Sequence, residues 1–132
     1  MLKMIAARRA WVLGVVLTAL TMPMAVSAQV WYEGGNLHQK GALDWQEATY
    51  NNKLATAGDF VAAAFNNGSL SDQLAASIKT VDDIKPLAVE LVKQLDDAFL
   101  AMPDARKNRS TYANQRVDSS AAMLMIMMGW LK

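Results

Sequence analysis

The sequence VDDIKPLAVELVKQLDDAFLAM, residues 81–102, decides the fold that we predict for this chain. Its apolar residues recur at alternating steps of three and four, and charged residues occupy the opposite side of the helix that this spacing predicts. Asp82 or Asp83 can cap the first turn, and Pro86 falls where its missing N–H costs little. Pro103 ends the segment. The positions predicted to be buried are Ile84, Ala88, Leu91, Leu95, Ala98 and Met102.

Residues 1–28 have the pattern of a secretory signal peptide. Basic residues precede an apolar run at residues 11–22, and small side chains follow at the positions that a signal peptidase reads. We predict cleavage between Ala28 and Gln29, which leaves residues 29–132 as a single helical domain, periplasmic or secreted. A retained membrane anchor is the alternative, although the apolar run is short for a lipid bilayer.

The mature chain is close to neutral and has no cysteine. Loss of Lys3, Arg8 and Arg9 with the signal peptide leaves ten basic residues against twelve acidic ones. This balance does not indicate a nucleic-acid-binding protein, and we expect membrane contact only through the signal peptide during export. Without disulfides, the fold must be held by its core alone. The Arg8-Arg9 pair leaves export by the twin-arginine route open.

An aromatic arm opens the mature chain at residues 31–41. Trp31 and Tyr32 precede two glycines, which interrupt regular structure, and His38 follows them. We predict that the arm folds back and buries its rings on the helices, because large rings bury much area at a small entropic cost. The alternative is an exposed aromatic patch that includes His38 and Trp45 and contacts a ligand or a partner.

Two further helices are predicted between this arm and the stretch quoted first. Asp44 can cap a helix that continues to Phe65. Ser69, with Asp72 three residues on, has the pattern of a capping box for a shorter helix of about three turns. The predicted apolar face of the longer helix comprises Tyr50, Leu54, Ala57, Val61 and Ala64.

A polar segment at residues 104–116 carries four basic side chains, those of Arg106, Lys107, Arg109 and Arg116. We predict a solvated loop here, because cations are favoured near the C-terminal end of the preceding helix. A docking patch for an acidic partner or for anionic lipid headgroups is the alternative.

The last segment, VDSSAAMLMIMMGWLK at residues 117–132, predicts a helix that begins near Asp118 and ends near Trp130. It is apolar on nearly every side, which is typical of a helix at the centre of a bundle, and it is too short to span a bilayer. Two alternatives compete with burial: an adaptable methionine surface for apolar partners, and Cu(I) binding by sulfur ligands. Against copper, Met123 and Met127 share one side of the helix whereas the other methionines point elsewhere.

The chain offers no recognisable catalytic or metal site. His38 is its one histidine, and no serine is placed as in a hydrolase. Metal sites usually need three or four converging donors, so a lone histidine favours a surface position. An enzyme would require a pocket that gathers His38 with carboxylates such as Glu33, Asp44 or Glu47. We therefore predict a protein that is not an enzyme, with no catalytic residues, no cofactor and no metal.

Three segments together resemble small exported helical proteins of bacteria. They are WYEGGNLH at residues 31–38, DDIKPLAVELVKQLDDA at residues 82–98 and AAMLMIMMGW at residues 121–130. More distantly, the layout is similar to the acid-stress chaperones of the HdeA type and to the Rap1a/Tai immunity proteins, which block secreted amidases. Members of both groups usually carry cysteines that staple helices, whereas this chain has none. The resemblance implies an all-α periplasmic binding protein and carries over no functional residue.

The sequence as a whole predicts an all-α domain, a small bundle of about four helices, that acts by binding. We expect an exported, chaperone-like or stress-protective protein that engages another protein through an apolar surface. An immunity-type inhibitor of a secreted cell-wall enzyme is the alternative, and an exposed Trp130 would favour a homodimer. The residues predicted to contact a partner are Trp31, Tyr32, His38, Trp45, Met125 and Trp130.

Overall fold

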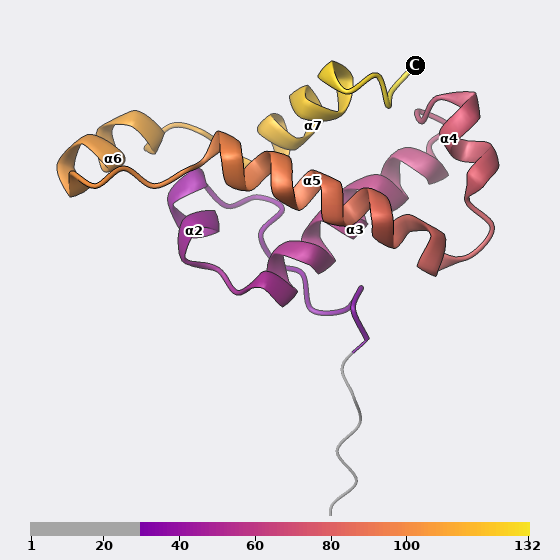
Figure 1. Cartoon of the computed structure of the whole chain (residues 1–132), viewed down its shortest axis with the longest axis horizontal. Helices are drawn as coiled ribbons and strands as arrows, with labels where there is room; N and C mark the ends of the chain where they lie inside the picture. Colours follow the sequence, from indigo (N-terminus) through magenta and orange to yellow (C-terminus); the bar gives the residue numbers. More distant parts are fainter. Residues whose placement is uncertain (1–29) are drawn as a thin grey trace, which may run out of the picture.

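The computed structural model describes residues 30–132, and every regular element in that range is a helix (Figure 1). The predicted all-α class is confirmed, with six α-helices and one 3-10 helix in place of about four helices. The predicted signal peptide, residues 1–28 with cleavage between Ala28 and Gln29, lies outside the described residues. In chain order the elements are α2 (Ala42–Glu47), α3 (Tyr50–Asn66), α4 (Asp72–Ser77), η3 (Val81–Ile84), α5 (Lys85–Ala98), α6 (Ala105–Tyr112) and α7 (Val117–Met127).

Helix α5 follows the amphipathic pattern of its sequence and packs against both α3 and α7. It ends earlier than predicted, because Phe99 is already its C-cap. Phe99 also completes the buried stripe, whereas Ala98 is exposed and Met102 is half-buried, so those two predicted positions were wrong. The observed stripe consists of Ile84, Ala88, Leu91, Val92, Leu95 and Phe99.

The 3-10 helix η3 leads into α5 and uses one of the two predicted acidic caps. Asp83 Oδ2 accepts hydrogen bonds from the backbone N–H groups of Lys79 and Thr80, at 2.8 and 2.9 Å. These bonds favour the charged carboxylate and lower the pKa of Asp83. Pro86 follows in the first turn of α5, where its missing N–H costs no helical hydrogen bond.

An aromatic row extends the core from α5 toward α2 and α6. Trp45 and Phe99 meet edge to face with ring centroids 6.5 Å apart, and Phe99 and Tyr112 do so at 6.2 Å. Rings in this arrangement attract one another beyond the effect of area burial. The row therefore ties the two short helices at one end of the molecule to the central helix (Figure 1).

The single helix predicted after Asp44 is in fact two helices, α2 and α3. The backbone is extended at Ala48, and Thr49 caps the second helix by accepting a backbone N–H at 3.2 Å. Asp44 lies inside the first turn of α2 rather than ahead of it. Tyr50 consequently starts α3 on its solvent side and is 53% exposed, whereas the rest of the predicted apolar face is buried.

Two other boundaries differ from the prediction. Ser71, not Ser69, caps α4 by accepting from Leu74 N at 3.3 Å. The segment predicted as a loop after Pro103 contains α6, whose cap is the Asp104 carboxylate, which accepts two backbone N–H groups at 3.0 and 3.2 Å. A carboxylate at this position satisfies free donors of the first turn and opposes the helix dipole. A segment without an apolar stripe can therefore still form a helix.

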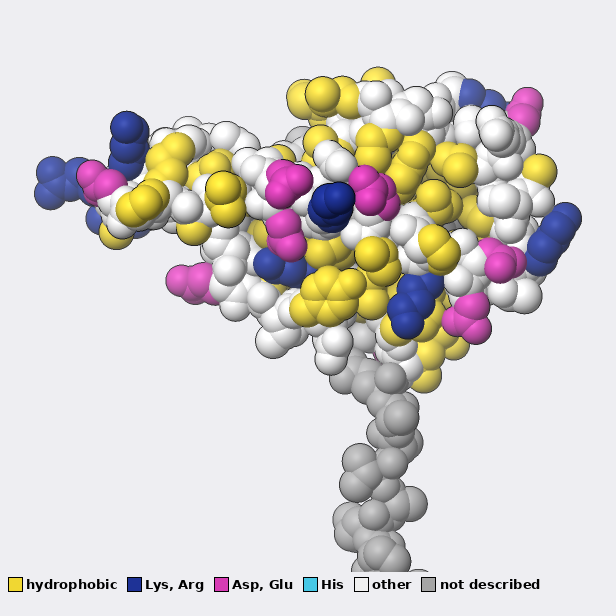
Figure 2. Space-filling view, in the orientation of Figure 1, with side chains coloured by type: hydrophobic (Ala, Val, Ile, Leu, Met, Phe, Trp, Pro, Cys, Tyr) yellow, Lys and Arg dark blue, Asp and Glu magenta, His cyan; other side chains and the backbone are white. Residues whose placement is uncertain are grey.

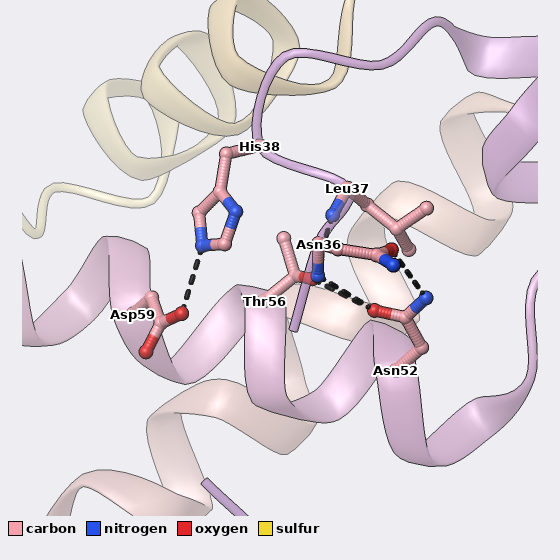
Figure 3. Close-up of polar contacts among 6 residues, drawn as sticks. All are labelled: Asn36, Leu37, His38, Asn52, Thr56 and Asp59. Carbon is pink, nitrogen blue, oxygen red and sulfur yellow. Dashed lines mark hydrogen bonds and ion pairs between the residues drawn. The ribbon is translucent and has the colours of Figure 1, made fainter. Parts of the chain in front are cut away.

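The arm at residues 30–41 lies back along α3, as the sequence predicts (Figure 3). Asn36 and Asn52 exchange two hydrogen bonds: Asn36 N donates to Asn52 Oδ1 at 3.0 Å, and Asn52 Nδ2 donates to Asn36 Oδ1 at 2.8 Å. The next residue, Leu37, is buried and its N–H donates to Thr56 Oγ1 at 3.3 Å. Polar side chains of α3 thus satisfy the backbone of the arm where it approaches the core.

Two glycines permit this close approach. A Cβ on Gly35 would lie 2.6 Å from the backbone nitrogen of Thr56, and a Cβ on Gly58 would lie 2.7 Å from Cζ3 of Trp31. The Trp31 ring therefore covers Gly58, and its Nε1 donates to Asp82 at 3.0 Å. The Trp31 ring is only half-buried, so the helices cover it less than predicted.

Gly58→Ala is expected to lower the free energy of unfolding by about 1 kcal/mol, because the new methyl group displaces the Trp31 ring. In a Trp31→Ala background the same substitution should raise it by up to about 1 kcal/mol, because alanine is the better helix former. Urea unfolding followed by circular dichroism measures both effects. An equal effect in the two backgrounds would contradict the contact between Trp31 and Gly58.

Candidate binding surface on the last helix

Helix α7 packs on α5 and α3 with one side of its surface. Val117, Ala121 and Met125 are buried on that side, and Leu124 and Met128 are half-buried against the same core. The sequence predicted that the whole helix is buried at the centre of the bundle. This prediction is wrong for the side of α7 that faces away from α3 and α5. The physical reason is position: α7 lies at the edge of the bundle, with its main neighbours on one side only (Figure 1).

The outer side of α7 exposes three large apolar side chains, which we call the α7 face. Met123, Ile126 and Met127 are 62%, 63% and 73% exposed. The one charged residue of α7, Asp118, lies in its first turn, so the α7 face carries no charge. Figure 2 shows apolar side chains gathered over α7 and in the band between α7 and α5. An exposed apolar patch of this kind is typical of a surface that binds another molecule.

An ion pair fixes the start of α7. Arg116 donates to the Asp118 carboxylate through Nε at 3.0 Å and Nη2 at 2.7 Å. Chiefly through these hydrogen bonds, Arg116 lowers the pKa of Asp118 to about 2. A carboxyl group whose pKa is lowered in the folded state stabilises the fold at any pH above its unfolded pKa of about 3.9. This stabilisation is lost as the pH falls toward the pKa of the folded state. The start of α7 therefore keeps its ion pair in mild acid.

A small pocket lies beside the α7 face, between α7 and α3. Its volume is about 210 Å³. An apolar cavity of about 150 Å³ is enough to hold benzene, so the pocket has room for one large apolar side chain. Its lining is mostly apolar, with three polar residues. The apolar residues are Phe60, Ala63, Ala64, Ala122, Met125 and Leu131, and the polar ones are Asn67, Ser69 and Asp118.

The end of the chain holds α7 in place. Gly129 adopts a positive φ of 74° after the helix, which turns the backbone toward α4. The Trp130 carbonyl accepts Ser71 N at 2.7 Å, and Lys132 Nζ lies 2.6 Å from a carboxylate oxygen of Asp72. The α7 face is therefore presented on a helix that is tied down at both ends.

The residues predicted to form one contact surface are separated in the structure. Trp45 is 0% and Met125 is 3% exposed, so both belong to the core and not to a surface. Trp31 and Tyr32 lie together on the arm, with ring centroids 5.5 Å apart. Trp130 is half-buried near the chain end. Tyr32 is 38% exposed, and the side chain of His38 is 37% exposed.

His38 is engaged by α3 and lies close to the pocket. Its Nε2 hydrogen-bonds Asp59 Oδ2 at 2.8 Å (Figure 3), and its ring meets Phe60, which lines the pocket, edge to face at 5.5 Å. Glu33 lines a different pocket at the arm, and Asp44 accepts Gly41 N at the start of α2. The carboxylate that His38 meets is therefore Asp59, and not Asp44 or Glu47, which lie on α2.

The methionine sulfurs of α7 do not share one site, since Met123 and Met127 are exposed on one side whereas Met125 is buried on the other. Within residues 30–132, no group of three or more His, Cys, Asp or Glu side chains is arranged to hold a metal ion. None of the helices in the same range combines the length and the apolar character needed to cross a membrane.

Comparison of the chain with protein-family models, with curated proteins and with solved structures gave no match. The resemblance to exported helical proteins therefore stays a prediction. Functional inference rests on the residues of this chain, and chiefly on the α7 face and the pocket beside it.

Proposed function

We propose that this protein is exported to the periplasm and acts there, without catalysis, by binding an apolar segment of another polypeptide on the α7 face. The observation that supports the proposal is the exposure of Met123, Ile126 and Met127 on a helix that is otherwise packed. Two of the three side chains are methionines, whose flexible thioether chains adapt to partners of different shape. A chaperone-like or stress-protective role is the use that fits such a surface.

The chemistry of the partner follows from what the surface lacks. The α7 face has no charge to attract an acidic or basic segment. The one charged residue that lines the adjoining pocket, Asp118, is paired with Arg116, and the pocket can accept one large apolar side chain. An amphipathic helix or an extended segment with a single bulky apolar anchor meets both conditions. The occupant is therefore an apolar segment that an unfolded or partly folded protein exposes.

The affinity expected from this surface is modest. Full burial of one large apolar side chain contributes about 1.5 to 3 kcal/mol, so three side chains that are about two-thirds exposed contribute about 3 to 6 kcal/mol before the cost of association. Such a surface releases its partners readily. Modest and adaptable binding favours transient protection of several proteins over tight inhibition of one.

The test is a triple variant of the α7 face, Met123→Gln, Ile126→Gln and Met127→Gln. Glutamine is a good helix former, so α7 should stay folded while its outer side becomes polar. The wild-type protein should suppress light scattering by reduced α-lactalbumin and by heat-unfolded malate dehydrogenase. The triple variant should need at least about ten times more protein for the same suppression, since it loses most of the apolar contact area.

A matched control changes exposed apolar residues elsewhere. Val81 and Val89 are 41% and 42% exposed, and a Val81→Gln, Val89→Gln variant should suppress scattering as well as the wild type. Equal activity of the α7 variant and the wild type would overturn the proposal. So would binding of a single partner in a fixed ratio, which indicates an immunity-type inhibitor, or self-association that the α7 variant abolishes, which indicates a homodimer.

The proposed location is tested separately. Expression of the full chain in a Gram-negative host should yield a periplasmic protein whose first residue is Gln29, as read by mass spectrometry of the intact chain. Retention in the membrane with residues 1–28 attached would contradict export as a processed protein.

A further inference from the structure

Helix α6 forms one end of the molecule and touches the rest of the chain along one side only (Figure 1). Asn108 Oδ1 accepts from Met102 N and from Gln46 Nε2, both at 3.1 Å. One turn later, Tyr112 is buried and its hydroxyl donates to Leu100 O at 2.9 Å. These two positions anchor the helix, and the rest of its surface faces solvent.

Three cations, Arg106, Lys107 and Arg109, occupy the side of α6 that faces away from Asn108 and Tyr112, and we call them the α6 cations. At about 100° per residue they fall within an arc of about 160° opposite the anchored side. All three are exposed, and among residues 30–132 no ion pair engages any of them. The nearest acid in the sequence, Asp104, is committed to the cap of α6.

Apolar residues lie directly beside these cations. Leu100 is 70% exposed, among the highest values for a large apolar side chain in the described chain, and Ala101 and Pro103 are also exposed. Figure 2 shows the Lys and Arg side chains at the end of the molecule formed by α6, next to apolar ones. Cations that flank an exposed apolar loop are the combination found in segments that lie on a lipid surface.

We propose that the loop at residues 100–103 and the α6 cations dock the protein on a membrane surface of anionic phospholipid. The charge complementarity is local: from residue 98 to residue 114 the chain has one acidic and three basic residues, although the predicted mature chain as a whole is slightly acidic. Lipid is the occupant that uses both features, because headgroup phosphates meet the cations while Leu100 enters the acyl boundary. The inference does not depend on the α7 face.

The test measures sedimentation of the chain from Gln29 to Lys132, which contains every described residue and the whole core, with lipid vesicles. The protein should bind mixed vesicles of phosphatidylglycerol and phosphatidylethanolamine. It should bind vesicles of phosphatidylcholine much more weakly. Each cation near an anionic surface raises partition about five-fold, so replacing all three α6 cations with glutamine should reduce it about 100-fold. Leu100→Gln should reduce it about ten-fold, because the apolar contact is lost.

A matched control separates local docking from net charge. Lys79, Lys85 and Lys93 are exposed on other elements, and their replacement by glutamine makes the same change in net charge. This variant should bind anionic vesicles as the wild type does. The proposal would be overturned if the two triple variants lost vesicle binding equally. It would also be overturned if salt did not weaken wild-type binding, or if the protein bound soluble polyglutamate as tightly as the vesicles.

Discussion

Replacing Trp45 with alanine is expected to lower the free energy of unfolding by about 3 to 5 kcal/mol. The side chain is 0% exposed and packs edge to face against Phe99. Its Nε1 donates to Asp96 Oδ1 at 2.9 Å, and Lys53 Nζ lies 5.5 Å from the ring centroid. A small domain has about 5 to 15 kcal/mol of stability in total, so this loss is a large fraction of it. Urea unfolding followed by far-ultraviolet circular dichroism gives the loss.

Two variants show whether the loss arises from burial of the Trp45 ring. Trp45→Phe keeps an aromatic ring but removes the donor to Asp96 and part of the buried ring volume, so we expect a loss of about 2 kcal/mol. Tyr50→Ala removes a ring that is 53% exposed, and should change stability by no more than about 0.5 kcal/mol. A loss in Trp45→Ala no greater than that in Tyr50→Ala would place Trp45 outside the core.

Periodicity predicted the elements whose apolar residues face one compact core. The stripe on α5 was predictable because charged residues fill its other side, which leaves one helical register. The break between α2 and α3 was not, since Asp44 and Thr49 are both good caps within one apolar pattern and the extended backbone at Ala48 decides between them. Thr49 caps α3, whereas Asp44 lies within the first turn of α2 after the Gly41 cap, so only one of the two predicted starts is used as a helix cap.

Helices α6 and α7 show two further limits of the sequence pattern. Asn108 and Tyr112 are the main anchors of α6, and a polar side chain is part of that contact, so hydrophobic periodicity does not detect this helix. In α7 the opposite holds, because apolar residues on every side hide which side is buried. The spacing of Met123 and Met127 placed them together, but only the positions of α3 and α5 decide that this side faces water.

Gly35→Ala is expected to lower the free energy of unfolding by about 3 kcal/mol, because a Cβ there meets backbone and not a movable side chain. The new atom would lie 2.6 Å from Thr56 N and 2.9 Å from Ala55 C. Neither atom can yield without distorting α3, so the arm must lift away. Lifting exposes Leu37 and removes the hydrogen bond from its N–H to Thr56 Oγ1. Urea unfolding by circular dichroism measures the loss.

Gly41→Ala is the matched control, because a Cβ at Gly41 meets its nearest neighbour, Gln115 O, at an ordinary 3.5 Å. Alanine is a poorer N-cap than glycine, so this variant should lose less than about 1 kcal/mol. A lifted arm also exposes the bond after Lys40 to trypsin, so Gly35→Ala should be cleaved there faster than either Gly41→Ala or the wild type. Equal stability and equal cleavage of the two glycine variants would mean that the arm does not lie against α3, and the hydrogen bond between His38 and Asp59, beside the pocket of α3 and α7, would then lose its support.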